Sequence, residues 1–264
     1  MTSDAMTPAG LPTDLIFYAV GGAATFLMGL GKGAFGGGLA ILGIPMLALV
    51  MDPIQAAIVT ALLVAFMDIF ALGSFPRSAW SKPDIAWIMP GFLGGLLAGF
   101  LVFELVDRRW VALVIALITI AYTVHYFARR GVPLAGIPVS PVLAGVAGAG
   151  AGFTTYVAHA GGPPMAMYLL RRDLTKTAYA ATTVAIFTVG NLVKLPGYIF
   201  SGLGEPGVFM KALALAPVVP VGVLAGRWLH DALPRERLFT LCYVLVGLAG
   251  AKLLYDASRA LWFT

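Results

Sequence analysis

Three charged side chains stand inside long apolar stretches of the sequence: Lys32, Asp68 and Lys194. A lysine or an aspartate at the centre of a membrane helix costs about 2.5–3.5 kcal/mol on insertion scales, so each needs a function or a partner. A buried ammonium group can hold an anion, and a buried carboxylate needs either a cation or a proton. We therefore interpret Lys32 and Lys194 as candidates for anion binding. Asp68 is either the partner of a lysine or a proton carrier.

Each of these residues also has a purely structural interpretation. A lysine can extend its ammonium group to the membrane interface, and for Lys194 this alternative and anion binding stay equally open. Asp68 could be a neutral residue that hydrogen-bonds to a neighbouring helix. For Lys32 we favour the functional interpretation, because this residue lies in a glycine-rich segment.

Two glycine-rich breaks interrupt the apolar pattern about 124 residues apart. In hydrocarbon, an interrupted helix is tolerated only where it is buried in protein or lines a cavity, and matching breaks in two halves mark a transport site. Free amide groups at the N-terminus of a half-helix would add positive potential beside Lys32. The breaks are Gly31-Lys32-Gly33-Ala34-Phe35-Gly36-Gly37-Gly38 and His159-Ala160-Gly161-Gly162-Pro163-Pro164.

These observations predict a set of substrate-binding residues. From the breaks we expect Lys32, Gly33, Phe35, Gly36, Gly37, Gly38, His159, Gly161, Gly162 and Pro163. Lys194 is added for its charge, and Thr60, Thr182, Asn191 and Tyr198 as neutral donors. Asp68 and His159 are the candidates for proton coupling, because a histidine titrates near neutral pH.

The composition predicts a membrane protein. Of 264 residues, 60% are hydrophobic and 11% are charged, and the mean hydropathy is +0.92. Soluble domains do not have this composition. Apolar stretches of spanning length cover residues 54–76, 85–105, 110–128, 178–201, 208–228 and 238–257, while 15–51 and 139–170 contain the breaks.

Basic residues predict the orientation of the chain. If each broken stretch is a hairpin that enters and leaves on one side, ten basic residues lie in cytoplasmic loops and five in outer loops. This arrangement places both termini in the periplasm. No basic residue precedes Lys32, so we expect the first apolar stretch to be retained rather than cleaved. The net charge of +5 is explained by these loops, and no nucleic-acid partner is expected.

The two halves of the chain share one plan. Leu97-Ala98-Gly99 recurs as Leu224-Ala225-Gly226, and Asn191 falls opposite Asp68 at an offset of 123. We predict an all-α polytopic protein of two inverted repeats, each a glycine-broken helical hairpin followed by three spanning helices. The first repeat covers residues 1–130, a junction loop 131–138, and the second repeat 139–264. Glycines spaced four apart, such as Gly91 and Gly95, are expected to pack helices together.

Motifs for other functions are missing from the sequence. Gly31-Lys32 lacks the remainder of a phosphate-binding loop, and the three histidines and single cysteine have no metal-ligand spacing. No hydrolase motif is present. We therefore expect no enzyme activity, no cofactor and no metal.

In the order and spacing of these segments the chain resembles the sulfite exporter TauE/SafE family, also called the toluenesulfonate uptake permeases. The resemblance rests on Gly36-Gly37-Gly38 with Pro45, on Ala56-Ala57-Ile58-Val59-Thr60, on Gly161-Gly162-Pro163-Pro164 with Tyr168-Leu169-Leu170, and on Asn191-Leu192-Val193-Lys194-Leu195 with Tyr198. It covers nearly the whole chain. Lys32 and His159 depart from the usual pattern of the family.

The resemblance implies a carrier in the bacterial inner membrane for a small anion such as sulfite, sulfoacetate or another organosulfonate. We expect a secondary transporter that works by alternating access, with proton coupling through Asp68 or His159 left open. The alternatives are a passive anion channel that uses the same breaks as a filter, and a membrane sensor or scaffold without flux. The oligomeric state is not predicted.

Overall fold

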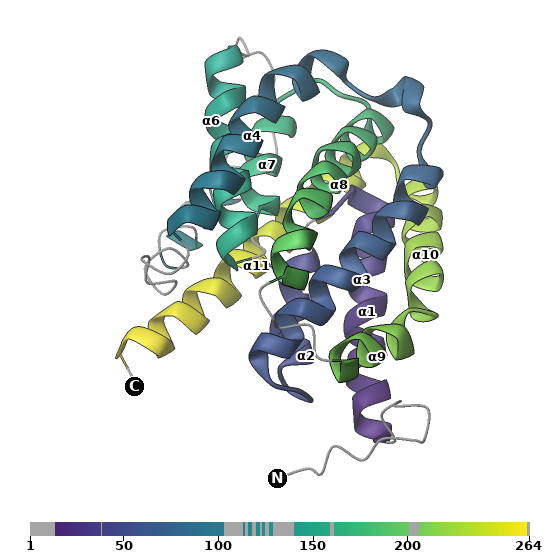
Figure 1. Cartoon of the computed structure of the whole chain (residues 1–264). Helices are drawn as coiled ribbons and strands as arrows, with labels where there is room; N and C mark the ends of the chain where they lie inside the picture. Colours follow the sequence, from purple (N-terminus) through teal and green to yellow (C-terminus); the bar gives the residue numbers. More distant parts are fainter. Residues whose placement is uncertain are drawn as a thin grey trace.

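The structure is a computed structural model in which every described element is helical (Figure 1). It describes residues 14–37, 39–102, scattered positions between 113 and 128, 140–158, 161–200 and 206–262. The longer helices are α1 (Leu15–Phe35), α3 (Pro53–Ser74), α4 (Lys82–Val102), α6 (Pro141–Ala158), α8 (Lys176–Phe200), α10 (Val218–Ala232) and α11 (Arg235–Trp262). The shorter ones are η1 (Leu39–Leu42), α2 (Gly43–Leu47), η2 (Arg77–Ala79), α7 (Gly162–Leu169) and α9 (Pro206–Leu215).

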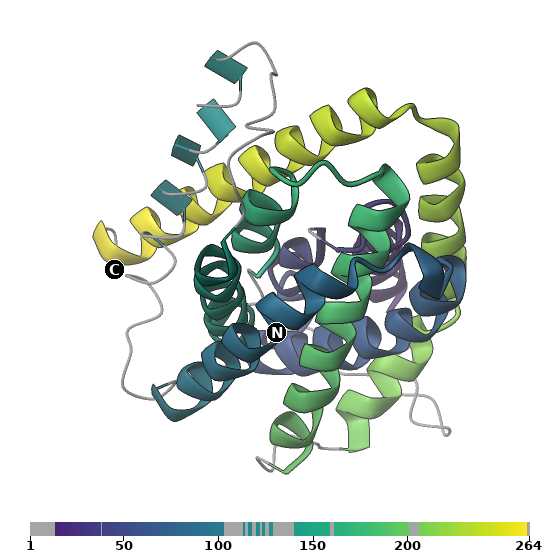
Figure 2. The same cartoon turned by 90° about the horizontal axis from the view of Figure 1, so that it is seen from above.

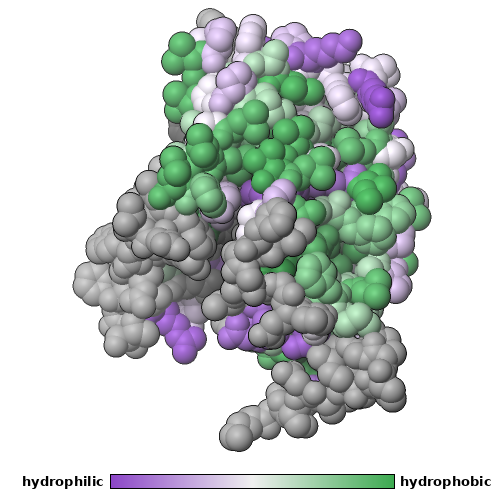
Figure 3. Space-filling model, viewed as in Figure 1, coloured by the Kyte–Doolittle hydropathy of each residue, from purple (hydrophilic) through white to green (hydrophobic). Residues whose placement is uncertain are grey.

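Several helices have the length and composition of membrane spans. Helices α1, α3, α4 and α8 meet both criteria, and α9 with α10 makes a fifth span if the bent pair is counted as one. A helix of 21 residues is about 32 Å long, which matches a hydrocarbon core of about 30 Å. Large apolar side chains are exposed along these helices, and apolar residues cover much of the face in Figure 3. The chain is therefore a multi-pass membrane protein.

Glycines bring two pairs of helices into close contact. Along α4, Gly91 and Gly95 face the backbone of Gly145 and Ala149 in α6, so the two helices run parallel. On the other side of the molecule, Gly29 faces Gly222 and any side chain at Gly33 would collide with the carbonyl oxygen of Val223. Helices α1 and α10 are thus also parallel, and the packing prediction for the glycine stripes is confirmed.

Helix α8 occupies the middle of the molecule. Figure 2 shows it between the α4–α6 pair and the α1–α10 pair, and it contacts α1, α3 and α4. This position brings the residues of α8 against both halves of the chain.

The basic loops gather at one end of the molecule. Lys176 donates to the carbonyl oxygens of His230 and Leu233 at 2.6 Å, so the start of α8 lies against the end of α10. Arg172 forms an ion pair with Asp84 at 2.9 Å, which places the start of α4 at the same end. In Figure 1 this end is uppermost, whereas α1 begins and α11 ends toward the lower side.

Two details of the sequence prediction need correction. The stretch 208–228 is not one straight span, because α9 and α10 meet at an angle of 40° around Pro217. The first break starts later than expected, since Gly31 and Gly33 are still part of helix α1. The predicted span over 110–128 lies mostly outside the described residues, as do the whole of the junction 131–138 and the residues Gly38 and His159.

Candidate functional site

Helix α1 ends at a glycine in a conformation that other residues rarely adopt. Gly36 has φ +79°, and its amide donates to the carbonyl oxygen of Lys32 at 3.0 Å, while the amide of Gly37 donates to Gly31 at 3.3 Å. These bonds satisfy the last carbonyl groups of the helix. Lys32 therefore lies in the last turn of a regular helix rather than at a half-helix N-terminus. The expected cradle of free amides around Lys32 is absent from this part of the structure.

Lys32 forms a buried ion pair with Asp68. Its Nζ lies 2.6 Å from Oδ1 of the carboxylate, and both side chains are 4% exposed. The other carboxylate oxygen accepts a hydrogen bond from the amide nitrogen of Asn191 at 2.7 Å. Of the two hypotheses for Asp68, pairing with a lysine is thus observed, and a proton-carrying role stays a prediction.

Lys194 is buried with no ion pair among the residues that the structure describes. The residue is 3% exposed, and its Nζ donates to the carbonyl oxygen of Thr155 at 3.3 Å and lies 3.5 Å from the hydroxyl of the same residue. No carboxylate among the described residues pairs with it. The side chain does not extend to an interface, so the snorkelling alternative does not describe this structure.

The second break presents a helix N-terminus beside Lys194. Helix α7 begins at Gly162 after Gly161, with no side-chain cap, and Pro163 and Pro164 have no amide proton to satisfy. The N-terminal end of a helix carries partial positive charge. The second break therefore places an uncapped helix N-terminus on the same pocket as Lys194.

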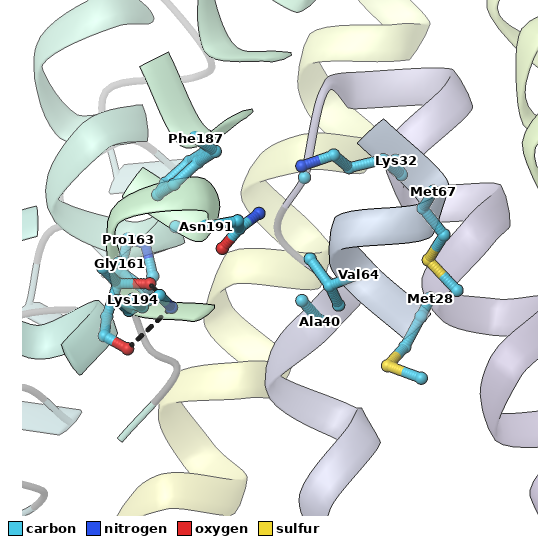
Figure 4. A pocket seen from close by; sticks show the side chains of 13 residues that line it. Met28, Lys32, Ala40, Val64, Met67, Gly161, Pro163, Phe187, Asn191 and Lys194 are labelled. Carbon is cyan, nitrogen blue, oxygen red and sulfur yellow. Dashed lines mark hydrogen bonds between the residues drawn. The ribbon is translucent and has the colours of Figure 1, made fainter. Parts of the chain in front are cut away.

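Lys32 and Lys194 line one pocket (Figure 4), whose empty space is about 530 Å³ when the open solvent at its mouth is included. Both halves of the chain contribute to its wall. The first half supplies Met28, Lys32, Gly37, Ala40, Val64 and Met67, and the second supplies Thr155, Gly161, Gly162, Pro163, Phe187, Asn191 and Lys194. The Nζ of Lys32 also lies 5.9 Å from the centre of the Phe187 ring, within cation–π distance.

Seven predicted residues therefore meet at the pocket: Lys32, Gly37, Gly161, Gly162, Pro163, Asn191 and Lys194. Gly33 packs against α10, Phe35 belongs to the hydrophobic core, and Gly36 ends α1. Thr182 accepts a hydrogen bond from the amide of Ser81 at 2.9 Å, away from the lining. Thr60 is fully buried in α3, also outside the lining, and the side chain of Tyr198 is outside the described residues.

The sequence analysis missed the apolar wall and Thr155. Met28, Val64, Met67 and Phe187 look like ordinary core residues, and nothing in the sequence separates them from the rest. Thr155 had a usable signal, because it lies 123 residues after Lys32, the offset that relates Asn191 to Asp68.

A second polar cluster, also missed, lies at the basic end. Asp84 is fully buried and accepts hydrogen bonds from the hydroxyl groups of Tyr168, at 2.9 Å, and Ser81. Together with Arg172, these contacts join the start of α4 to the end of α7. They connect the hairpin α6–α7 to the remainder of the bundle, and none of these residues lines the pocket.

A helical bundle with apolar side chains on its surface and buried charged side chains around a central pocket is typical of membrane transport proteins. Comparison with protein families agrees with this class. Residues 21–253 match the model of the family described as sulfite exporter TauE/SafE, and the chain belongs to that family of membrane transporters. No curated protein and no solved structure matched the chain.

Proposed function

We propose that the chain is a secondary transporter for a small sulfur-containing anion, such as sulfite or an organosulfonate, and that the anion binds in the pocket between the two halves. The observation that carries this proposal is Lys194, a buried ammonium group with no carboxylate partner among the described residues. An unpaired buried charge costs several kcal/mol, and a bound anion would remove this cost. The amide group of Gly162, at the start of α7, would add a donor to the same anion.

The helix packing supports an inverted repeat. If α1 corresponds to α6 and α4 to α10, then the parallel pair α4–α6 is the counterpart of the parallel pair α10–α1. Helices α3 and α8, which would correspond to each other, are in contact. We place the first repeat at 1–130 and the second at 139–264. Alternating access would then follow from movement of one repeat against the other around the pocket.

The gathered basic loops support the orientation. Arg77, Lys82, Arg171, Arg172 and Lys176 belong to the end where α4 and α8 begin. By the positive-inside rule this end faces the cytoplasm, in a bacterial inner membrane, and both chain termini face the periplasm.

Proton coupling is a further part of the proposal. Asp68 is the described candidate, since it lies beside the pocket and could release Lys32 by taking up a proton. His159 is the second candidate, from the sequence alone. Flux whose pH dependence is the same in Asp68→Asn as in the native protein would exclude Asp68 from this role.

Counterflow in proteoliposomes tests the proposal. Labelled sulfite should exchange with unlabelled sulfite in a saturable manner through the native protein and through Lys82→Ala, whose side chain is exposed at the basic end. Lys194→Ala should lose the exchange, and Lys32→Ala should reduce it. An ionic conductance far above the turnover of a carrier would instead support the channel, and no anion flux through folded protein would reject the transport proposal.

A further inference from the structure

The charges around the pocket can be counted. Among the described residues, the charged groups at the pocket are Lys32 and Lys194, which line it, and Asp68, which contacts Lys32. Lys32 and Asp68 neutralise each other at 2.6 Å, and Asn191, the donor to the second carboxylate oxygen, is neutral. Of the charges in the described part of the chain at this pocket, the positive charge of Lys194 is left for a ligand.

The described remainder of the pocket wall contains neutral polar groups, such as Thr155 and Asn191, and apolar side chains, but no further cation. Met28, Val64, Met67, Pro163 and Phe187 contribute apolar surface. In Figure 4, Val64, Met67 and Met28 lie on the right with Lys32, whereas Lys194 lies on the left. A second anionic group directed toward this wall would be desolvated without a partner, which costs several kcal/mol.

We propose that the pocket selects singly charged anions and that Asp68 is the residue that sets this selectivity, by cancelling the charge of Lys32. This inference rests on the proposed function and sharpens it. With a single negative charge bound at Lys194 the occupied pocket is neutral, whereas a doubly charged anion leaves one negative charge uncompensated. The substrate is then a sulfonate with a neutral remainder, or singly charged hydrogen sulfite, rather than doubly charged sulfoacetate.

Two probes of nearly equal shape separate charge from size. Sulfoacetamide carries one negative charge and sulfoacetate carries two, because the amide replaces the carboxylate. Competition of each probe against labelled sulfite in proteoliposomes gives their relative affinities. The native protein should prefer sulfoacetamide by at least about tenfold, and Lys82→Met, at the basic end, should show the same preference.

Two variants change the charge of the pocket in a known way. Asp68→Asn leaves both lysines uncancelled, so the ratio of the two affinities should move toward sulfoacetate by at least about tenfold. The double variant Lys32→Met with Asp68→Asn returns the pocket to one positive charge. Its preference should return to sulfoacetamide.

The outcomes separate this inference from the proposed function. A native protein that transports sulfite but prefers sulfoacetate overturns the inference and leaves the transport proposal intact. The same holds if the ratio of the two probe affinities in Asp68→Asn equals that of the native protein. A native protein that neither transports sulfite nor binds either probe rejects the proposed function itself. If Asp68→Asn does not fold, a native preference for sulfoacetate still overturns the inference.

Discussion

The amide of Asn191 donates a hydrogen bond of 2.7 Å to the carboxylate of Asp68, although the two residues lie 123 positions apart in the chain. One residue lies on α3 and the other on α8, and in the proposed repeats they would occupy equivalent positions. Their contact therefore joins the halves beside the pocket. It also orients the carboxylate that pairs with Lys32.

Substitutions at Asn191 should separate the loss of its hydrogen bond from the effect of a negative charge at this position. Asn191→Leu removes the hydrogen bond to one carboxylate oxygen of Asp68, which should cost about 1–3 kcal/mol of stability. Asn191→Asp instead adds a second carboxylate beside Asp68, and its negative charge should weaken anion binding more than the leucine does. Thermal unfolding in detergent and sulfite competition measure the two effects. Equal loss of anion binding in both variants would contradict a role for charge.

The ion pair between Lys32 and Asp68 should matter more to stability when it is broken than when it is removed. Lys32→Met leaves a buried carboxylate without its cation and should destabilise the protein by about 3–5 kcal/mol. The double variant Lys32→Met with Asp68→Leu removes both charges and should recover most of that loss. Thermal unfolding of the native protein, both single variants and the double variant gives the coupling. Additive single effects would show that the pair is not formed in the membrane.

The close contact between helices α4 and α6 should leave no room for a side chain at Gly152. Any methyl group at Gly152 would collide with the carbonyl oxygen of Phe92, so Gly152→Ala should lower the midpoint of thermal unfolding and the yield of monodisperse protein. Gly94 lies on the same pair of helices with nothing within 4 Å of the equivalent position. Gly94→Ala should behave like the native protein in size-exclusion chromatography, and equal losses in both variants would be evidence against this packing.

The orientation can be mapped with single cysteines. Cys242 is the only native cysteine, so Cys242→Ser provides a background without thiols. Lys82→Cys and Arg172→Cys should react with a membrane-impermeant thiol reagent only after cells are opened, and Asp14→Cys should react in intact spheroplasts. Labelling of Asp14→Cys and Lys82→Cys from the same side would contradict the topology.

The main spans could be predicted from the sequence because lipid imposes a simple requirement on length and polarity. The predicted stretches 54–76, 85–105 and 178–201 correspond to α3, α4 and α8, with ends that differ by at most three residues. The bend between α9 and α10 was missed because apolar composition is the same on both sides of Pro217. The composition of a segment indicates whether it lies in lipid or in water. The direction of the helix depends instead on backbone geometry.

The residues of the site were only partly predictable. Gly31, Gly33 and Gly36 form one run in the sequence, yet Gly33 allows α10 to approach and Gly36 ends the helix. Their different roles come from tertiary contacts that a single sequence does not record. Similarly, the sequence offered two lysines for Asp68, and only the structure assigns Lys32 to it and leaves Lys194 facing the pocket.

Equilibrium binding of radiolabelled sulfite to the purified protein tests the central claim most directly. We predict saturable binding at one site in the native protein and in Lys82→Met, and a loss of affinity of at least about tenfold in Lys194→Met. Folding of each variant is checked by size-exclusion chromatography. Saturable binding that is unchanged in folded Lys194→Met would contradict an anion site in this pocket.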